Sequence, residues 1–157
     1  MKRLISDIFL VAWALWFGGA VAILVLVQHL FQTNRDLAVQ AAPQLFLTFE
    51  KYQLVLAAVV VLSLFGVAAR KRLLATLVLS AAAIAALSAC FVTPRINNLR
   101  LAGGQGSSAF RMLHGISMSI YLIEVVLLLI TGLVLKWNVL KSNSQQEENP
   151  PHVALIK

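Results

Sequence analysis

The chain has little of what soluble enzymes and disulfide-stabilised domains are built from. Only 12% of its 157 residues are charged, and a single cysteine, Cys90, excludes a disulfide within the chain. We find no phosphate-binding glycine loop, no nucleophile–base pair and no paired carboxylates at an active-site spacing. With 60% hydrophobic residues, the composition also excludes a soluble domain beside the apolar part. We therefore expect a protein without enzymatic activity.

Four long apolar runs take up most of the chain. They cover about residues 8–30, 52–69, 73–92 and 112–135. A helix needs roughly 20 mostly apolar residues to cross a bilayer core about 30 Å thick, because each residue adds about 1.5 Å. We therefore expect an all-α, four-helix transmembrane bundle with up-down-up-down order. Its single domain covers residues 1–141, and residues 142–157 form a disordered cytoplasmic tail.

The N-terminus resembles a signal peptide, because Met1, Lys2 and Arg3 precede an apolar run. The apolar region of a signal peptide is usually about 7–15 residues long. Here the hydrophobic stretch continues without a break through Phe31. We therefore expect an uncleaved first helix.

Basic residues predict how the bundle is oriented. With four spans, both termini and the turn at residues 70–72 share one side, which carries eight of the 13 lysines and arginines, and the other side carries five. Positive loops stay in the cytoplasm, so we expect both termini there, in a bacterial inner membrane. The basic residues form no stripe with interleaved aromatics, so we expect no nucleic-acid partner. The expected partners are the lipid bilayer, a second copy of the chain or other membrane proteins.

One face of the fourth run is polar. Glu124 lies near its mid-depth, where an ionised group costs on the order of 2.5–3.5 kcal/mol. Helical spacing places it on one face with other polar residues, namely His114, Ser117, Tyr121 and Thr131. This polar inter-helix site has two interpretations. It lines a ligand or proton path, or it joins helices through hydrogen bonds worth about 0.6 kcal/mol each on average.

Two histidines are candidate ligands. His29 ends the first run and His114 begins the fourth, so the predicted topology places both at the outer membrane face. Opposed histidines suit a b-type haem, and histidine near Cys90 and methionines suits copper. Neither histidine has the spacing of a known ligand motif. We expect no cofactor, with haem b or copper at His114 and His29 as the alternative.

Small and aromatic residues in the first run predict close helix packing. Trp16, Gly18 and Gly19 are the candidates, and Gly18 with Ala22 forms a small-xxx-small pair.

Two outer segments indicate where the second helix begins and where the third helix ends. Pro43 suits a first helical turn, so we expect the second helix to begin near it, and Thr93 before Pro94 is expected to end the third.

These features together resemble a known family, the transmembrane protein 205-like proteins, also called domain of unknown function 4149. The resemblance covers roughly residues 8–135. It rests on four motifs: Trp16, Phe17, Gly18 and Gly19; Phe46, Phe49 and Tyr52; Pro94, Arg95, Ile96 and Asn97; and Phe110, Arg111, Met112, Leu113, His114, Gly115, Ile116 and Ser117. It implies a small four-helix integral membrane protein, points to His114 and Ser117 as family positions, and implies no reaction.

The sequence therefore predicts a non-enzymatic integral membrane protein with a polar inter-helix site on its fourth helix. Two alternatives remain open. One is a haem- or copper-binding redox or metal-handling protein. The other is a small-molecule or proton-coupled transporter that uses Glu124.

Overall fold

The computed structural model describes residues 2–67 and 72–148, and this part of the chain is almost entirely helical, without strands. Its elements are α1 (Lys2–Thr33), α2 (Arg35–Val67), α3 (Arg72–Leu87), the π-helical turn η1 (Ser88–Val92), α4 (Thr93–Leu101), the 3-10 turn η2 (Gly104–Gly106) and α5 (Ser108–Glu148). Because α3, η1 and α4 follow one another without interruption, they act as one long helix. The predicted all-α, four-helix architecture is confirmed.

Each of the four long helices can cross a membrane by length and composition. The candidate spans are Arg3–Thr33, Arg35–Leu64, Arg72–Leu101 and Ser108–Trp137. Large apolar side chains such as Val25, Leu62 and Leu133 are exposed on their outward faces. Lipid accepts such faces, and helices satisfy their own backbone hydrogen bonds there. The chain is therefore a multi-pass integral membrane protein.

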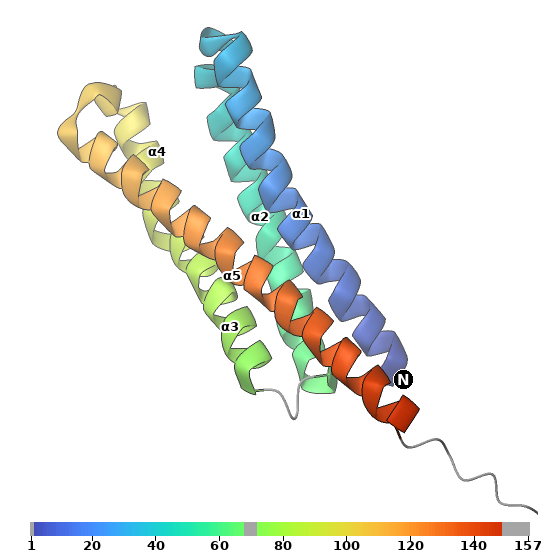
Figure 1. Cartoon of the computed structure of the whole chain (residues 1–157). Helices are drawn as coiled ribbons and strands as arrows, with labels where there is room; N and C mark the ends of the chain where they lie inside the picture. The colour runs from blue at the N-terminus through green and yellow to red at the C-terminus, as the bar shows by residue number, and fades with distance from the viewer. Residues whose placement is uncertain (1, 68–71, 149–157) are drawn as a thin grey trace, which may run out of the picture.

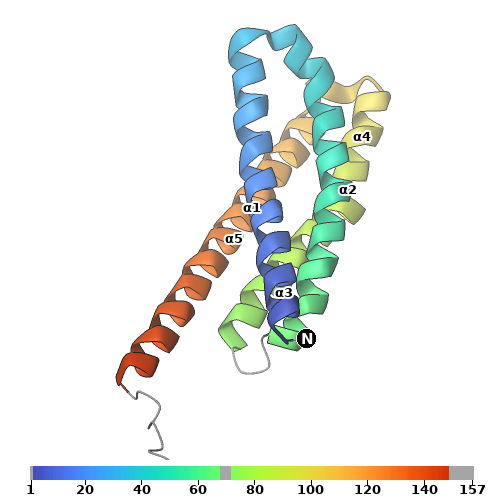
Figure 2. The ribbon, with the colours of Figure 1, turned by 90° about the vertical axis from the view of Figure 1, so that its right-hand side faces the viewer.

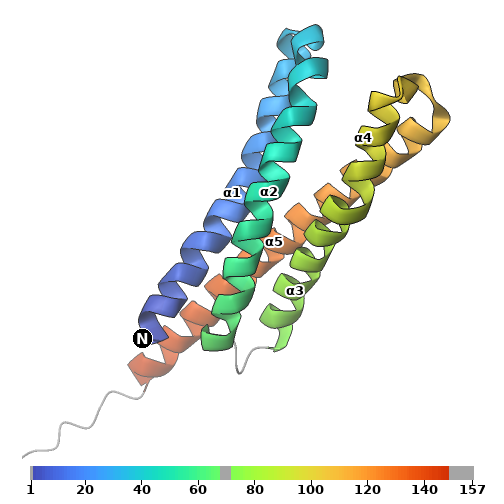
Figure 3. The same ribbon diagram turned by 180° about the vertical axis from the view of Figure 1, so that it is seen from behind.

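The helices form two pairs that converge at one end. Chain direction alternates from one long helix to the next, α1 packs mainly along α2, and α3 packs mainly against α5 (Figures 1 and 3). The apolar core lies in the half of the bundle that holds the N-terminus, where Trp16 of α1, Val60 of α2, Val78 of α3 and Leu128 of α5 are fully buried. At the other end, the α1–α2 pair stands apart from α4 and the start of α5.

Helix α2 begins eight residues earlier than expected. It starts at Arg35 and contains Pro43 in its interior. Asn34 caps it, because its Oδ1 accepts the backbone N–H of Leu37 at 3.0 Å. The helical packing face also continues through the proline, with Ala42 buried before it and Phe49 buried after it, and Pro43 removes only a single backbone hydrogen bond. The prediction of a helix start near Pro43 was wrong.

The third helix does not end at Thr93. The backbone N–H of Thr93 bonds to the carbonyl of Ser88, five residues back, which is the bond of a π turn. Pro94 then occupies the first turn of α4, where its missing N–H needs no helical partner. The helix ends instead near Gly103, whose φ of 72° is a left-handed conformation that glycine adopts freely.

The C-terminal helix is longer than predicted. Helix α5 continues to Glu148, so residues 142–148 are helical where a disordered tail was expected. Residues 149–157 lie outside the described part of the chain, as do Arg70 and Lys71 of the predicted basic turn. Figure 2 shows α5 crossing the bundle diagonally, and along its length α5 contacts α3, α4 and α1.

Candidate functional site

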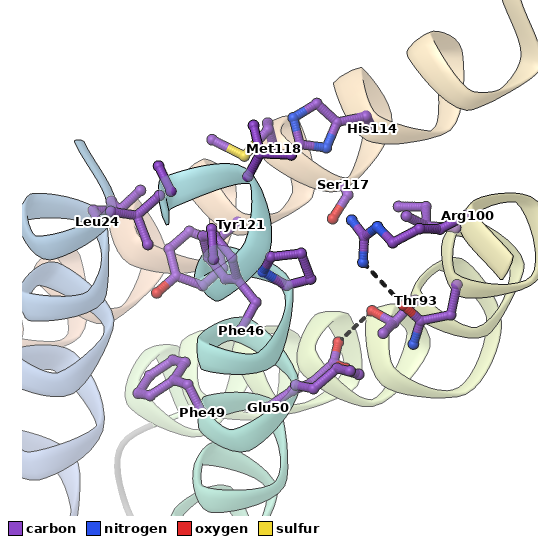
Figure 4. A pocket seen from close by; sticks show the side chains of 18 of the residues that line it. Leu24, Phe46, Phe49, Glu50, Thr93, Arg100, His114, Ser117, Met118 and Tyr121 are labelled. Carbon is purple, nitrogen blue, oxygen red and sulfur yellow. Dashed lines mark hydrogen bonds between the residues drawn. The ribbon is translucent and has the colours of Figure 1, made fainter. Parts of the chain in front are cut away.

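A pocket of about 580 Å³ lies between the helix pairs, in the half of the bundle away from the N-terminus (Figure 4). Its walls come from the last turns of α1, the first half of α2, the η1–α4 segment and the first half of α5. The volume falls within the roughly 300–1,000 Å³ typical of ligand pockets. All four long helices therefore contribute to one cavity.

The floor of the pocket carries hydrogen-bond acceptors from α2. The half-buried carboxylate of Glu50 accepts the hydroxyl of Thr93 at 2.7 Å. One turn deeper, Gln53 is only 2% exposed, and its Oε1 has no hydrogen-bond partner among the residues that the structure describes. A buried polar atom without a partner costs about 1–3 kcal/mol, so native structures seldom leave one. This amide oxygen is the strongest indication that the floor receives another group.

The π turn η1 builds one wall of this floor. Ser88 and Thr93 both line the pocket although they are five residues apart, which in a regular α-helix places them on different faces. The wider turn brings them onto the same face, and Ile96, Asn97 and Arg100 follow at helical spacing. Such π turns occur often at functional sites. Here its effect is to aim two hydroxyl side chains at the level of Glu50.

Aromatic rings form the wall above the floor. The ring of Tyr121 meets Phe46 edge-on with centroids 5.7 Å apart, and Phe49 at 6.3 Å. The hydroxyl of Tyr121 donates to the backbone carbonyl of Ala20 at 2.8 Å, which ties α5 to α1. Edge-to-face pairs of this kind are stabilising and hold the rings in fixed orientations. The wall is therefore apolar and rigid, since the one polar atom of Tyr121 is already used.

The mouth of the pocket is basic. Arg100 lies two turns along α4 from Thr93, about 10 Å at about 1.5 Å per residue. Its guanidinium donates to Asn97 at 3.3 Å and lies 5.9 Å from the ring centroid of Phe110. Phe110 in turn stacks on His114, with the rings 4° from parallel. The pocket therefore has hydrogen-bond acceptors, including a carboxylate, at its floor and a positively charged guanidinium at its mouth.

The structure divides the predicted polar face of α5 into two parts. His114, Ser117 and Tyr121 line the pocket. Glu124 does not line it, because its side chain is 1% exposed and accepts the indole N–H of Trp16 at 2.9 Å. Further along, Thr131 donates to its own helix at the carbonyl of Leu127. The outer part of the face therefore lines the pocket, and in the inner part Glu124 joins α5 to α1.

The predicted packing residues of α1 lie in different surroundings. Trp16 is fully buried, and a Cβ added to Gly19 would come within 2.8 Å of Phe49 on α2. Gly18 is exposed, and nothing lies within 4 Å of the position of its Cβ. A close approach that the sequence did not predict occurs at Gly132 of α5, where the ring of Trp13 would lie 2.5 Å from an added Cβ.

The two candidate metal or haem ligands are not equivalent. His114 lines the pocket mouth, whereas His29 is exposed near the end of α1 and is not among the lining residues. Within the described ranges, no three His, Cys, Asp or Glu side chains gather in a way that could hold a metal ion. Cys90 is exposed. The structure therefore does not bring His114 and His29 together at the pocket.

Sequence reasoning missed the floor of the pocket. Glu50 and Gln53 were placed outside or at the very end of the second span, because hydropathy falls between residues 32 and 51. A signal was present: Ala38, Ala42, Phe49 and Gln53 repeat at helical spacing and are all buried. That repeat continues from the apolar run into the supposed loop, and it marks a helix facing protein rather than lipid.

The fold and the pocket show that the chain is a multi-pass integral membrane protein with four long helices around an inter-helix pocket. The family model described as Domain of unknown function (DUF4149) matches residues 11–105 of the 157. The chain therefore belongs to this family. The match includes Glu50, Gln53, Ser88 and Thr93 of the floor, and α5 lies outside it. None of the curated proteins and none of the solved structures compared with the chain matches it.

Proposed function

We propose that this DUF4149 protein is a non-enzymatic integral membrane protein that binds a small amphipathic molecule in the pocket between its helix pairs. The observation that carries the proposal is the combination of a pocket of about 580 Å³ with a buried amide oxygen, on Gln53, that has no partner in the described part of the chain. A bundle that served only as a scaffold has no physical reason to keep either feature, because interiors pack densely and buried polar atoms are paired.

The depth of the floor supports a ligand that enters from the bilayer or its outer surface. Gly19 packs against Phe49, one residue from Glu50, and Gly19 is the midpoint of the apolar run at residues 8–30. Tyr121, which also meets Phe49, lies well inside the apolar run of α5. The polar floor is therefore level with the apolar middle of two helices. An aqueous solute alone would not need aromatic walls at that depth.

The direction of the mouth follows from the proposed topology. The mouth is lined by residues of α4 and of the first turns of α5. These segments lie at the end of the bundle opposite the N-terminus (Figure 1). With both termini in the cytoplasm, as the basic residues favour, the pocket opens toward the outer side of the membrane. We also propose that the protein lies in a bacterial inner membrane and is similar to transmembrane protein 205. That likeness includes Phe110, His114 and Ser117, which line the mouth.

The alternatives receive less support from the geometry. A carrier that uses Glu124 needs that carboxyl to reach a pathway, yet it is buried against Trp16 and does not line the pocket. We assign Glu124 to helix packing. A haem or copper site that uses both histidines needs His29, which does not line the pocket.

Two serines on α5 provide a matched test. Ser117 points into the pocket, as Figure 4 shows, and Ser119 is exposed and bonds to the carbonyl of Gly115. Ser117→Phe fills the pocket with a benzyl group, and Ser119→Phe adds the same group to the outward face. Small molecules extracted from the wild type and both variants, purified in one mild detergent, are compared by mass spectrometry. We expect a compound enriched with the wild type and Ser119→Phe and lost from Ser117→Phe. Equal contents in all three would contradict the proposal.

A further inference from the structure

We infer that the floor of the pocket is a subsite for the ammonium group of an amphipathic amine, held by the carboxylate of Glu50 and the amide oxygen of Gln53. This inference rests on the proposed function and names the chemical class of its ligand. The floor of the pocket has hydrogen-bond acceptors, and one of them lacks a donor in the described part of the chain. Glu50 and Gln53 supply acceptor oxygens, and the Gln53 oxygen has no donor among the described residues. A group with several N–H donors and a positive charge satisfies both residues at once.

Aromatic side chains surround the floor of the pocket. Phe46, Phe49 and Tyr121 line the same pocket as Glu50, and Figure 4 shows Phe46 and Tyr121 above Glu50. The Tyr121 hydroxyl is already bonded to the backbone carbonyl of Ala20. Aromatic faces attract cations within about 6 Å and accept an apolar body equally well. The walls therefore suit a molecule with a cationic head at the floor and an apolar or aromatic body above it.

The positively charged Arg100 at the mouth is a weaker candidate for setting the ligand selectivity than the floor. Arg100 could hold an anion, but its guanidinium already donates to Asn97 and rests over Phe110. It also lies about 10 Å nearer the solvent than the floor, where water weakens electrostatic attraction. Gln53 is 2% exposed, so an interaction there forms in surroundings of low polarity and is correspondingly stronger. The cationic head at the floor therefore sets the selectivity, and Arg100 leaves room for an anionic group at the outer end of the ligand.

The test uses three probes with the same phenylalkyl body: phenethylamine, the neutral 2-phenylethanol and the anionic 3-phenylpropionate. Affinities are measured by isothermal titration calorimetry with the full chain in lipid nanodiscs, and empty nanodiscs provide the partitioning background. We expect the amine to bind about tenfold or more tightly than the alcohol, in keeping with the strength of hydrogen bonds to charged groups, and the carboxylate to bind most weakly.

Three variants test which residues cause the preference for the amine. Glu50→Gln keeps an oxygen that accepts the Thr93 hydroxyl and removes the charge, so we expect it to abolish the preference for the amine while the alcohol still binds. Asp36→Asn is the matched control, because Asp36 is an exposed acid on the same helix that does not line the pocket. It should leave all three affinities unchanged. Gln53→Leu should weaken amine binding with little effect on the alcohol, and thermal unfolding of each variant verifies that it is folded.

The outcomes separate the two proposals. Binding of the alcohol as tightly as the amine, or an amine preference that survives Glu50→Gln, overturns the ammonium subsite and leaves the proposed function standing. Tighter binding of the carboxylate, lost in Arg100→Gln, also overturns it and assigns selectivity to the mouth. If none of the three probes binds above the nanodisc background, the proposed function itself fails.

Discussion

The hydrogen bond between Trp16 and Glu124 allows the most quantitative prediction about the bundle. Both side chains are buried, at 0% and 1% exposure, and the indole N–H donates to the carboxyl at 2.9 Å. Glu124→Leu removes the acceptor and leaves a buried N–H without a partner, which costs about 1–3 kcal/mol in proteins generally. Side-chain hydrogen bonds between membrane helices average about 0.6 kcal/mol with a maximum near 1.7. We therefore expect Glu124→Leu to lower the free energy of unfolding by about 1–2 kcal/mol.

A conservative variant distinguishes the bond from the charge. Glu124→Gln retains an oxygen that accepts the indole N–H in a side chain of the same length, so we expect a loss below about 0.5 kcal/mol. The free energies are measured by titrating the protein in mild detergent with sodium dodecyl sulfate and following helix content by circular dichroism.

A double-mutant cycle then isolates the pair. Trp16→Phe removes the donor and keeps an aromatic ring, and combining it with Glu124→Leu removes both partners. Because replacing both partners by apolar groups can be nearly neutral, the double variant should lose less stability than the sum of the single variants, by about 0.6–1.7 kcal/mol. Strict additivity, or a Glu124→Leu variant as stable as the wild type, would refute the assignment of Glu124 to packing.

The remaining predictions concern packing, cofactors and orientation. Gly132→Ala should destabilise the bundle by about 1–2 kcal/mol in the same unfolding assay, because its Cβ would meet the ring of Trp13, whereas Gly115→Ala on the same helix has open space and should be neutral or slightly stabilising. Equal effects of the two changes would contradict the packing described here. The purified chain should show no Soret band and no stoichiometric copper, and a Soret band lost in His114→Ala would instead establish a haem protein. A fluorescent-protein reporter fused to the C-terminus should fluoresce in bacteria, as it does only in the cytoplasm, and a dark but stably inserted fusion would reverse the proposed topology.

The long apolar runs made the fold predictable from the sequence. Four runs near 20 residues leave few options in a membrane, since lipid requires every backbone polar group to be satisfied within a helix. The ends of the helices were harder to predict. The first half of α2 faces the pocket rather than lipid, so its hydropathy is low although Ala38, Ala42 and Gln53 repeat at helical spacing. Hydropathy measures contact with lipid, and it therefore underestimates a membrane helix that faces a polar cavity.

The candidate site was predicted only in part, for two physical reasons. His114, Ser117 and Tyr121 share a helical face by spacing alone, and the structure does bring them to one pocket. The opposing wall depends on the π turn, which places Ser88 and Thr93 on one face, and on which helices pair. A regular helix separates residues five apart by about 140°, so no helical-wheel argument joins these two side chains. Helix pairing was also unpredictable, because runs that are apolar all round do not indicate which face is buried.

Photoaffinity labelling determines whether the pocket holds an amphipathic molecule. A phenylalkyl alcohol that carries a diazirine is irradiated with the wild type in nanodiscs, and the labelled residues are identified by mass spectrometry. We expect labels on Phe46, Ile96 and Tyr121 that excess unlabelled alcohol prevents and that Ser117→Phe removes. Labels spread over outward residues such as Leu62 and Leu129, unchanged by Ser117→Phe, would show that the probe meets the protein only from the lipid and would contradict the claim.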